Sequence, residues 1–274
     1  MPVIAITSPD DPRLDDYRAV RDPELVRRRG LFIAESRLVV ARLVALPRYA
    51  IRSILATEAG LAGLRELTGD AAVASDPPIY VASDAVIESL GGIQFHRGCL
   101  AIAERPAPLD PAAVIAAAAP GRPLVVVEGV AHPDNVGSIF RNARAFGAAG
   151  VLLDDASVDP LYRKALRTAM GASLIVPWTR LDPWPTGLSR LRDAGHVVAA
   201  LTPHPSSDTL EGFVGAHGGR PIALLVGGEG GGLTPAALAH ADARVRIPMA
   251  PGADSVNVAT ATGIALHALT RLRN

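Results

Sequence analysis

Three polar stretches interrupt the apolar C-terminal half of the chain and decide its fold. The longest reads LVGGEGGGL at residues 225–233 and sets five glycines around Glu229. The second reads RIPM at 246–249 with DSVNVA at 254–259, and the third reads NVGSIFRN at 135–142. Each follows an apolar run, and glycine is favoured where backbone or ligand approaches closely. Together they indicate a composite ligand site on an α/β framework.

Near-continuous apolar runs around these stretches are typical of strands in a parallel sheet covered on both faces. The predicted strands are 124–128, 150–153, 174–177, 196–201, 222–226 and 243–247. Helices fit between them at 137–147, 160–170, 186–194 and 234–240, with a last helix at 256–271. Ligands of such sheets bind at the carboxyl ends of the strands, where the polar stretches lie.

The first third of the chain predicts a smaller α/β domain. Its strand-like runs are 31–34, 51–56, 79–81 and 99–103, and its helical patterns are 35–46 and 83–90. A stretch rich in proline and alanine follows, and proline suits a boundary because it restricts its own backbone and that of the preceding residue. We therefore expect a domain at 1–105, a linker at 106–123 and a second domain at 124–274.

The composition is that of a globular protein, with 49% hydrophobic and 20% charged residues among 274. No apolar run approaches the roughly 18 residues of a membrane span, and the N-terminus lacks the pattern of a signal peptide. Cys99 is the only cysteine, so no internal disulfide can form and a reducing, cytoplasmic location is expected. Its apolar strand makes Cys99 a core residue rather than a nucleophile.

The charges balance at 27 basic and 27 acidic residues, so no global field indicates a nucleic-acid partner. Lys164 is the only lysine, however, and arginine is the better residue for planar contact with phosphate. The basic residues are also bunched, at Arg13, Arg18, Arg21, Arg27, Arg28, Arg29, Arg141, Arg144, Arg163, Lys164 and Arg167. A solvated surface remains an equal interpretation for Arg27–Arg29.

Several ligand classes fit the glycine-rich stretch poorly. Leu233 stands where a P-loop needs lysine and serine or threonine, and Glu229 would repel a pyrophosphate. The seven histidines and one cysteine lack zinc-ligand spacing, so no metal is expected. The serine-hydrolase elbow is also absent. A neutral or cationic ligand suits the stretch better.

The three stretches resemble, in order and spacing, the motifs of the SpoU branch of the SPOUT methyltransferases, over residues 124–273. That family transfers a methyl group from S-adenosylmethionine to a ribose 2′-hydroxyl of RNA. Residues 159–171 also resemble the middle of the family's catalytic domain. Residues 20–105 resemble its small substrate-binding domain, with 30–35 as the opening strand and 97–101 as the last. Ser36 stands where that domain more usually has glycine.

The resemblance implies a parallel SPOUT sheet with a C-terminal trefoil knot, and a homodimer whose site lies at the interface. The catalytic residues that it implies are Arg141, Asn135, Glu229, Ser255 and Asn257. The implied cofactor-binding residues are Gly227, Gly228, Ile247, Met249 and Val256, and Thr202 joins them because it follows a predicted strand.

Simpler roles compete with the implied ones. Asn135 could cap a helix beginning near Gly137, and Ser255 and Asn257 could cap the last helix. Glu229 is expected to accept hydrogen bonds from Asn135 or the backbone. The guanidinium of Arg141 stays protonated, so we expect it to orient the hydroxyl and stabilise charge rather than act as a base.

The resemblance therefore implies an S-adenosylmethionine-dependent RNA 2′-O-ribose methyltransferase. Ribosomal RNA is the favoured substrate, because substrate domains of this type are typical of ribosomal RNA enzymes in the family. Three alternatives stay open at this point: a transfer RNA enzyme, a non-catalytic RNA-binding or ribosome assembly factor, and a nucleotide-binding metabolic enzyme.

Overall fold

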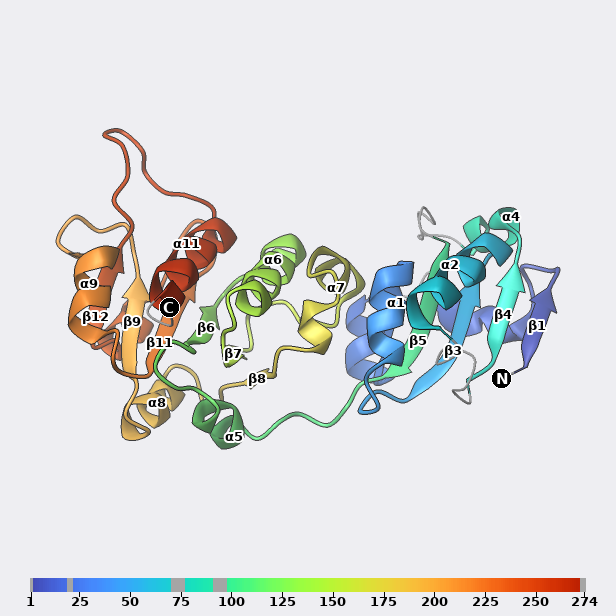
Figure 1. Cartoon of the computed structure of the whole chain (residues 1–274), viewed down its shortest axis with the longest axis horizontal. Coiled ribbons are helices and arrows are strands. Elements are labelled where there is room, and N and C mark those ends of the chain that lie inside the picture. Colours follow the sequence, from blue (N-terminus) through green and yellow to red (C-terminus); the bar gives the residue numbers. More distant parts are fainter. Residues whose placement is uncertain (1, 19–21, 70–76, 91–97, 272–274) are drawn as a thin grey trace. The chain divides into compact units, whose positions relative to one another are not determined.

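The computed structural model describes residues 2–18, 22–69, 77–90 and 98–271. The chain divides into two compact units, whose elements are labelled in Figure 1. Unit 1 is Met1–Ala107 with Leu161–Leu174, and unit 2 is Pro108–Pro160 with Ile175–Asn274. Arg21 and Arg97, which the sequence analysis singled out, lie outside the described residues. In the described part of the chain, no helix is long and apolar enough to cross a membrane.

The described part of unit 1 contains a five-stranded mixed sheet in the order β1-β4-β3-β5-β2. Strands β1, β4 and β3 run parallel, and β5 runs antiparallel to both β3 and β2. The strands are β1 Val3–Ile6, β2 Leu31–Glu35, β3 Ile51–Ala56, β4 Ile79–Ala82 and β5 Cys99–Glu104. Four of them confirm the sequence prediction, and β1 is additional. Cys99 is fully buried in β5, as expected.

Helices α1 and α2 of unit 1 pack against each other and against the sheet. The helices are α1 Arg37–Val44, α2 Glu58–Thr68, α4 Asp84–Glu88 and α7 Arg163–Thr168, with short helical turns η1 Pro12–Tyr17, η2 Glu24–Arg28 and η3 Ala172–Leu174. Helix α1 begins after Ser36, whose φ of 89° is a conformation that favours glycine. The strained turn explains why glycine is more usual at this position.

Several of the bunched arginines are neutralised inside unit 1. Arg167 donates to both oxygens of Glu35, a carboxylate only 4% exposed at the end of β2. Arg29 pairs with Asp16, whereas Arg27 and Arg28 are exposed on η2 without an ion pair among the described residues. Arg13, Arg18, Arg29 and Arg167 therefore serve local ion pairs, whereas Arg27 and Arg28 face solvent.

The described part of unit 2 contains a seven-stranded sheet in the order β10-β12-β9-β11-β6-β7-β8, with every pair parallel. The strands are β6 Leu124–Glu128, β7 Gly150–Leu153, β8 Trp178–Arg180, β9 Val197–Leu201, β10 Asp208–Thr209, β11 Ile222–Gly227 and β12 Ala243–Arg246. The predicted α/β class and parallel sheet are confirmed. The trefoil knot stays a prediction.

Helices cover both faces of this sheet, which explains why its strands are apolar throughout. The helices are α5 Pro111–Ala116, α6 Pro133–Ala145, α8 Ser189–Asp193, α9 Leu210–His217, α10 Pro235–Ala239 and α11 Val258–Thr270, with the turn η4 Thr186–Leu188. Side chains of α5, α8 and α10 share one core cluster with alternate strand residues such as Leu124 and Val126. Helix α11 packs against α6, α9 and β11, and Figure 1 shows α6 and α11 on the opposite side of the strands from α5 and α8.

Two predicted boundaries in this half were wrong. The strand expected at 174–177 is absent from the described structure: Leu174 ends η3, and the strand begins at Trp178. Pro177 has no N–H to give to a sheet, but its carbonyl accepts from the amide of Val151 at 2.9 Å, so pairing starts beside it. Helix α6 begins at Pro133, four residues before its predicted start, because proline suits the first helical position.

Candidate functional site

The carboxyl ends of four adjacent strands form the edge where the polar stretches meet. The strand order β12-β9-β11-β6 brings these ends side by side, and all the pairs are parallel. A pocket of about 600 Å³ opens there, a size suited to a small-molecule cofactor. All six predicted cofactor-binding residues line it: Thr202, Gly227, Gly228, Ile247, Met249 and Val256.

Main chain forms one wall of this pocket, between Gly227 and Gly232. The loop closes on itself through a hydrogen bond from the amide of Gly232 to the carbonyl of Gly228, at 3.1 Å. A Cβ at Gly228 would lie 2.0 Å from the carbonyl oxygen of Gly129. Glycine is therefore required at 228, because the backbone of the next loop occupies the space of a side chain.

A chain of two hydrogen bonds joins the three sequence motifs. Asn257 donates from Nδ2 to Oδ1 of Asn135 at 2.9 Å, and Asn135 donates from Nδ2 to Oε1 of Glu229. The second bond is the contact that we expected for Glu229. Asn257 and Glu229 also line the pocket, so this chain of polar side chains lies at its margin.

The capping role considered for Asn135 is wrong. The N-cap of α6 is His132, and Asn135 lies within the first turn. Its amide is thus available to link the other two motifs. Asn257, by contrast, is the N-cap of α11, where its Oδ1 accepts from the amides of Ala259 and Thr260 at 2.9 and 3.3 Å. Asn257 therefore caps α11 with its Oδ1 and binds Asn135 with its Nδ2.

The remaining two predicted catalytic residues are exposed. Ser255 lines the pocket and belongs to a stretch, residues 250–257, that is exposed at every position. Arg141 lies on α6, the same helix as Asn135, but does not line the pocket. Among the described residues, no side-chain partner holds Arg141. Its guanidinium can thus contact a ligand that approaches from solvent.

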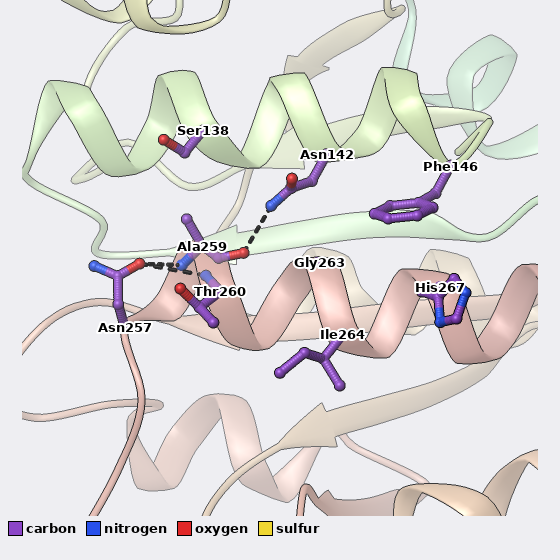
Figure 2. A pocket seen from close by; sticks show the side chains of 9 residues that line it. All are labelled: Ser138, Asn142, Phe146, Asn257, Ala259, Thr260, Gly263, Ile264 and His267. Carbon is purple, nitrogen blue, oxygen red and sulfur yellow. Dashed lines mark hydrogen bonds between the residues drawn. The ribbon is translucent and has the colours of Figure 1, made fainter.

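A shallow groove between α6 and α11 adjoins the pocket (Figure 2). In Figure 2, Phe146 and His267 face each other at one end of the groove. Their rings pack edge to face, with ring centroids 5.7 Å apart. Near the middle lie Gly263 and Ile264, and the side chain of Ile264 is 41% exposed. Asn257 lines both the groove and the pocket.

A buried network, which the sequence analysis missed, fixes the loop between β6 and α6. Asp154 accepts from the amide of Gly129 at 2.9 Å and from the hydroxyl of Ser157 at 2.5 Å. Ser157 in turn accepts from the amide of Val130 at 3.1 Å. Asp154 directly follows the apolar run of β7, and a carboxylate that ends a buried strand was the available signal.

The described residues contain no group of three or more His, Cys, Asp or Glu that could hold a metal ion. The polar groups that line the pocket are instead the amide of Asn257, the carboxylate of Glu229, the hydroxyls of Thr202 and Ser255, and exposed main chain. Such groups bind an organic cofactor by hydrogen bonds, and the Glu229 carboxylate favours a ligand that carries positive charge.

Comparison with known proteins places this geometry in a family. Residues 122–267, more than half of the chain, match the SpoU rRNA Methylase family. A protein described as an uncharacterized tRNA/rRNA methyltransferase of Mycobacterium tuberculosis is 43% identical over 271 residues, covering 97% of this chain and 91% of that protein. A 23S rRNA (guanosine-2′-O-)-methyltransferase of Photobacterium profundum is 30% identical over 150 residues, covering 55% and 60% of the two chains.

Solved structures agree over the whole length. An rRNA methyltransferase from Sinorhizobium meliloti has a TM-score of 0.82 at 25% identity, covering 99% of each chain. Its AdoMet-bound form has a TM-score of 0.79 at 26% identity, covering 98% of each. The fold and the site thus define an RNA methyltransferase that uses S-adenosylmethionine. The chain belongs to the SpoU rRNA Methylase family.

Proposed function

We propose that this protein methylates a ribose 2′-hydroxyl of ribosomal RNA, with S-adenosylmethionine held in the glycine-lined pocket. The observation that carries the proposal is the chain from Asn257 through Asn135 to Glu229, which ties the three family motifs together at the pocket margin. The relative from Photobacterium profundum is named for 2′-O-methylation of 23S rRNA.

The residues around the pocket suit the cofactor chemically. When bound, S-adenosylmethionine supplies a methyl group activated by a positively charged sulfur. The Gly227–Gly232 wall offers main-chain donors and acceptors for the adenosine and methionine parts. The apolar side chains of Ile247, Met249 and Val256 would enclose the adenine, and Thr202 would add a hydroxyl.

Arg141 would bind the RNA. It projects from the helix that carries Asn135, about one and a half turns further along, and its guanidinium is free to form two parallel hydrogen bonds with a phosphate. Held there, it would orient the ribose hydroxyl and stabilise developing charge, while the proton leaves to a phosphate or to water. Ser255 and Asn257, which line the pocket, would supply further polar contacts to the reacting groups.

Mapping of 2′-O-methylated nucleotides tests the substrate. RNA from cells with and without the gene should differ at one or a few positions of ribosomal RNA. A difference confined to transfer RNA would overturn the ribosomal substrate but keep the ribose chemistry. Loss of a base methyl group, with all ribose methyl groups retained, would overturn the 2′-O assignment itself. A cytoplasmic location, expected from the single cysteine, stays a prediction.

We further propose that a second copy of the chain covers the groove between α6 and α11. The groove exposes Ile264, and it is continuous with the site through Asn257, so a partner seated there would lie beside the reacting groups. Ile264→Glu should give a monomer with reduced transfer in sedimentation and activity assays. Leu67, 54% exposed on α2, supplies the control: Leu67→Glu should remain dimeric. A wild-type chain that sediments as a monomer would refute the dimer.

A further inference from the structure

Glu128 is a buried carboxylate at the edge of the sheet where the pocket opens. It is the last residue of β6 and is 4% exposed. An ionised carboxylate is costly to bury unless it is well hydrogen-bonded. Among the described residues its partners are neutral donors: Trp184 Nε1 and Thr234 Oγ1 both reach Oε1 at 2.8 Å, and the Thr234 amide reaches Oε2 at 2.8 Å.

The main chain of Glu128 holds the first end of the glycine loop. Glu128 pairs with Gly227 in the sheet, and its carbonyl accepts from the amide of Gly228 at 2.8 Å. The loop runs from Gly228 to Gly232, and Thr234 lies two residues beyond it. Glu128 therefore fixes the first end of the loop with its carbonyl and the second end with its carboxylate.

We propose that Glu128 is a positioning residue for the cofactor, acting through the glycine loop. Four of the five residues from Gly228 to Gly232 are glycines, so little in the loop's own sequence restricts its shape. It also carries Glu229, which accepts the hydrogen bond from Asn135. Anchoring both ends sets the wall of the pocket and the position of Asn135 together. This inference rests on the proposed placement of S-adenosylmethionine in that pocket.

A purely structural role is the competing explanation, because Thr234 is also the N-cap of α10. Its Oγ1 accepts from the amide of Ala237 at 3.1 Å. Loss of Glu128 would then lower stability without changing the affinity for cofactor. The two roles are separated by measuring the dissociation constant for S-adenosylmethionine by calorimetry, well below the melting temperature, beside the melting temperature itself.

Glu128→Gln is the first variant. In either orientation of its amide, the NH2 group would face a donor, the amide of Thr234 or the indole N–H of Trp184, so the hold on the second end of the loop should weaken. We expect the dissociation constant to rise about tenfold or more, since a hydrogen bond to a charged group is lost. Thr179→Val is the control, because it removes another buried hydrogen bond of unit 2, from Thr179 Oγ1 to the carbonyl of Leu109 at 2.7 Å. It should lower the melting temperature and leave the dissociation constant within about twofold.

Thr234→Ala provides a milder second variant in case Glu128→Gln does not fold. It loses the hydroxyl bond to Glu128 and the cap of α10, and it should weaken cofactor binding by about threefold to tenfold. Thr209→Ala removes the corresponding cap of α9, where Thr209 Oγ1 accepts from the amide of Gly212 at 3.2 Å, and should leave binding unchanged. Thr234→Ser keeps the amide and the hydroxyl that donate to Glu128, so its affinity for S-adenosylmethionine should match that of the wild type.

Unchanged cofactor affinity in both Glu128→Gln and Thr234→Ala, with lowered melting temperatures, would overturn the positioning role. Equal weakening in the two control variants would overturn it as well. Failure of the proposed function gives a different result: the wild-type chain would not bind S-adenosylmethionine, or Gly228→Val would bind it normally.

Discussion

Asn257 and Asn135 are 122 residues apart in the sequence, yet they share a hydrogen bond of 2.9 Å. This bond fastens the start of the last helix to the first turn of α6. Through Asn135, it also links the polar stretch at residues 254–259 to Glu229 of the glycine loop. The site therefore forms only when the C-terminal helix has docked.

Two substitutions of Asn257 should separate its two roles. Asn257→Asp keeps a capping oxygen, so the melting temperature should stay near that of the wild type, but it places a carboxylate against Asn135 Oδ1 and should lower methyl transfer about tenfold or more. Asn257→Ala should lose transfer and also about 1 kcal/mol of stability. Thermal unfolding and single-turnover transfer measure the two effects. Wild-type transfer by Asn257→Asp would contradict the role in the site.

Arg141→Ala should lower the rate of methyl transfer about a hundredfold or more. The affinity for S-adenosylmethionine should stay nearly intact, because Arg141 does not line the pocket. Arg141→Lys should also fail, since an ammonium cannot reproduce the planar fork of guanidinium. Arg144→Ala is the matched control, because Arg144 is another exposed arginine on α6. Near-normal turnover by Arg141→Lys would reject the geometric role.

The glycine loop offers a comparison between neighbouring positions. Gly228→Val places a side chain where the carbonyl of Gly129 lies 2.0 Å from the Cβ, and it should weaken cofactor binding by about 1–3 kcal/mol. Gly230→Val should also weaken it, because the φ of 86° at this position disfavours a branched side chain. Gly215→Ala is the control: Gly215 lies on α9 away from the pocket lining, its added methyl group would meet no atom within 4 Å, and the variant should bind normally in calorimetry. Equal affinities for all three variants would contradict the main-chain wall.

The framework of the site could be predicted from the sequence because strand periodicity and burial are local signals. Strands β6 and β7 begin and end at the predicted residues, and all six predicted cofactor-binding residues share one pocket. Strand order explains why the polar stretches converge, since they follow parallel strands whose carboxyl ends meet at one edge. The residues expected to bind the cofactor came mainly from the resemblance to the SpoU branch.

The supporting contacts could not be predicted, because they join residues distant in sequence. Glu128 reads as the polar end of an apolar run, and nothing local links it to Thr234, 106 positions away. Helix α7 is another case. It lies in the segment Leu161–Leu174, which interrupts unit 2 in the sequence but clusters with unit 1, where Arg167 meets Glu35 across 132 positions. Periodicity gives the helix but not the unit in which its side chains find partners.

Arg27 and Arg28 test whether unit 1 contributes to RNA binding. If they contact phosphates, Arg27→Ala/Arg28→Ala should weaken RNA binding. The slope of the logarithm of the binding constant against the logarithm of salt concentration should also become shallower by about 1–2. Adding Arg29→Ala would also remove the ion pair with Asp16, so the double variant is the cleaner test. Arg190→Ala/Arg192→Ala, on α8, removes equal charge elsewhere. Identical slopes for both double variants would leave Arg27 and Arg28 as a solvated surface.

Truncation of residues 1–105 is a less direct version of this experiment. The segment Leu161–Leu174 belongs to unit 1, and Arg167 within it would lose Glu35. Any loss of RNA affinity in the truncated chain would then include the disturbance of that segment. The substitutions avoid this effect because the full chain keeps its packing.

Cys99 should be unreactive in the folded chain. Burial raises the pKa of its thiol to about 12, so at pH 8 only about one molecule in ten thousand carries the thiolate. An unfolded chain loses this proton near pH 8.5, so the thiol favours unfolding as the pH rises above that value. Thiol-reagent kinetics with and without denaturant measure the first effect. Melting temperatures of the wild type and Cys99→Ala between pH 7 and about 10 measure the second, and equal pH dependence would contradict it.

The main-chain wall between Gly227 and Gly232 also bears on inhibitor design. Five of its six positions present only atoms that every amino acid shares, so a point mutation cannot delete a contact made to them. A side chain added at Gly228 would collide with the protein's own carbonyl before it reached a ligand. An inhibitor whose hydrogen bonds are confined to this wall would therefore leave few routes to resistance, and escape would have to arise from the apolar side chains across the pocket.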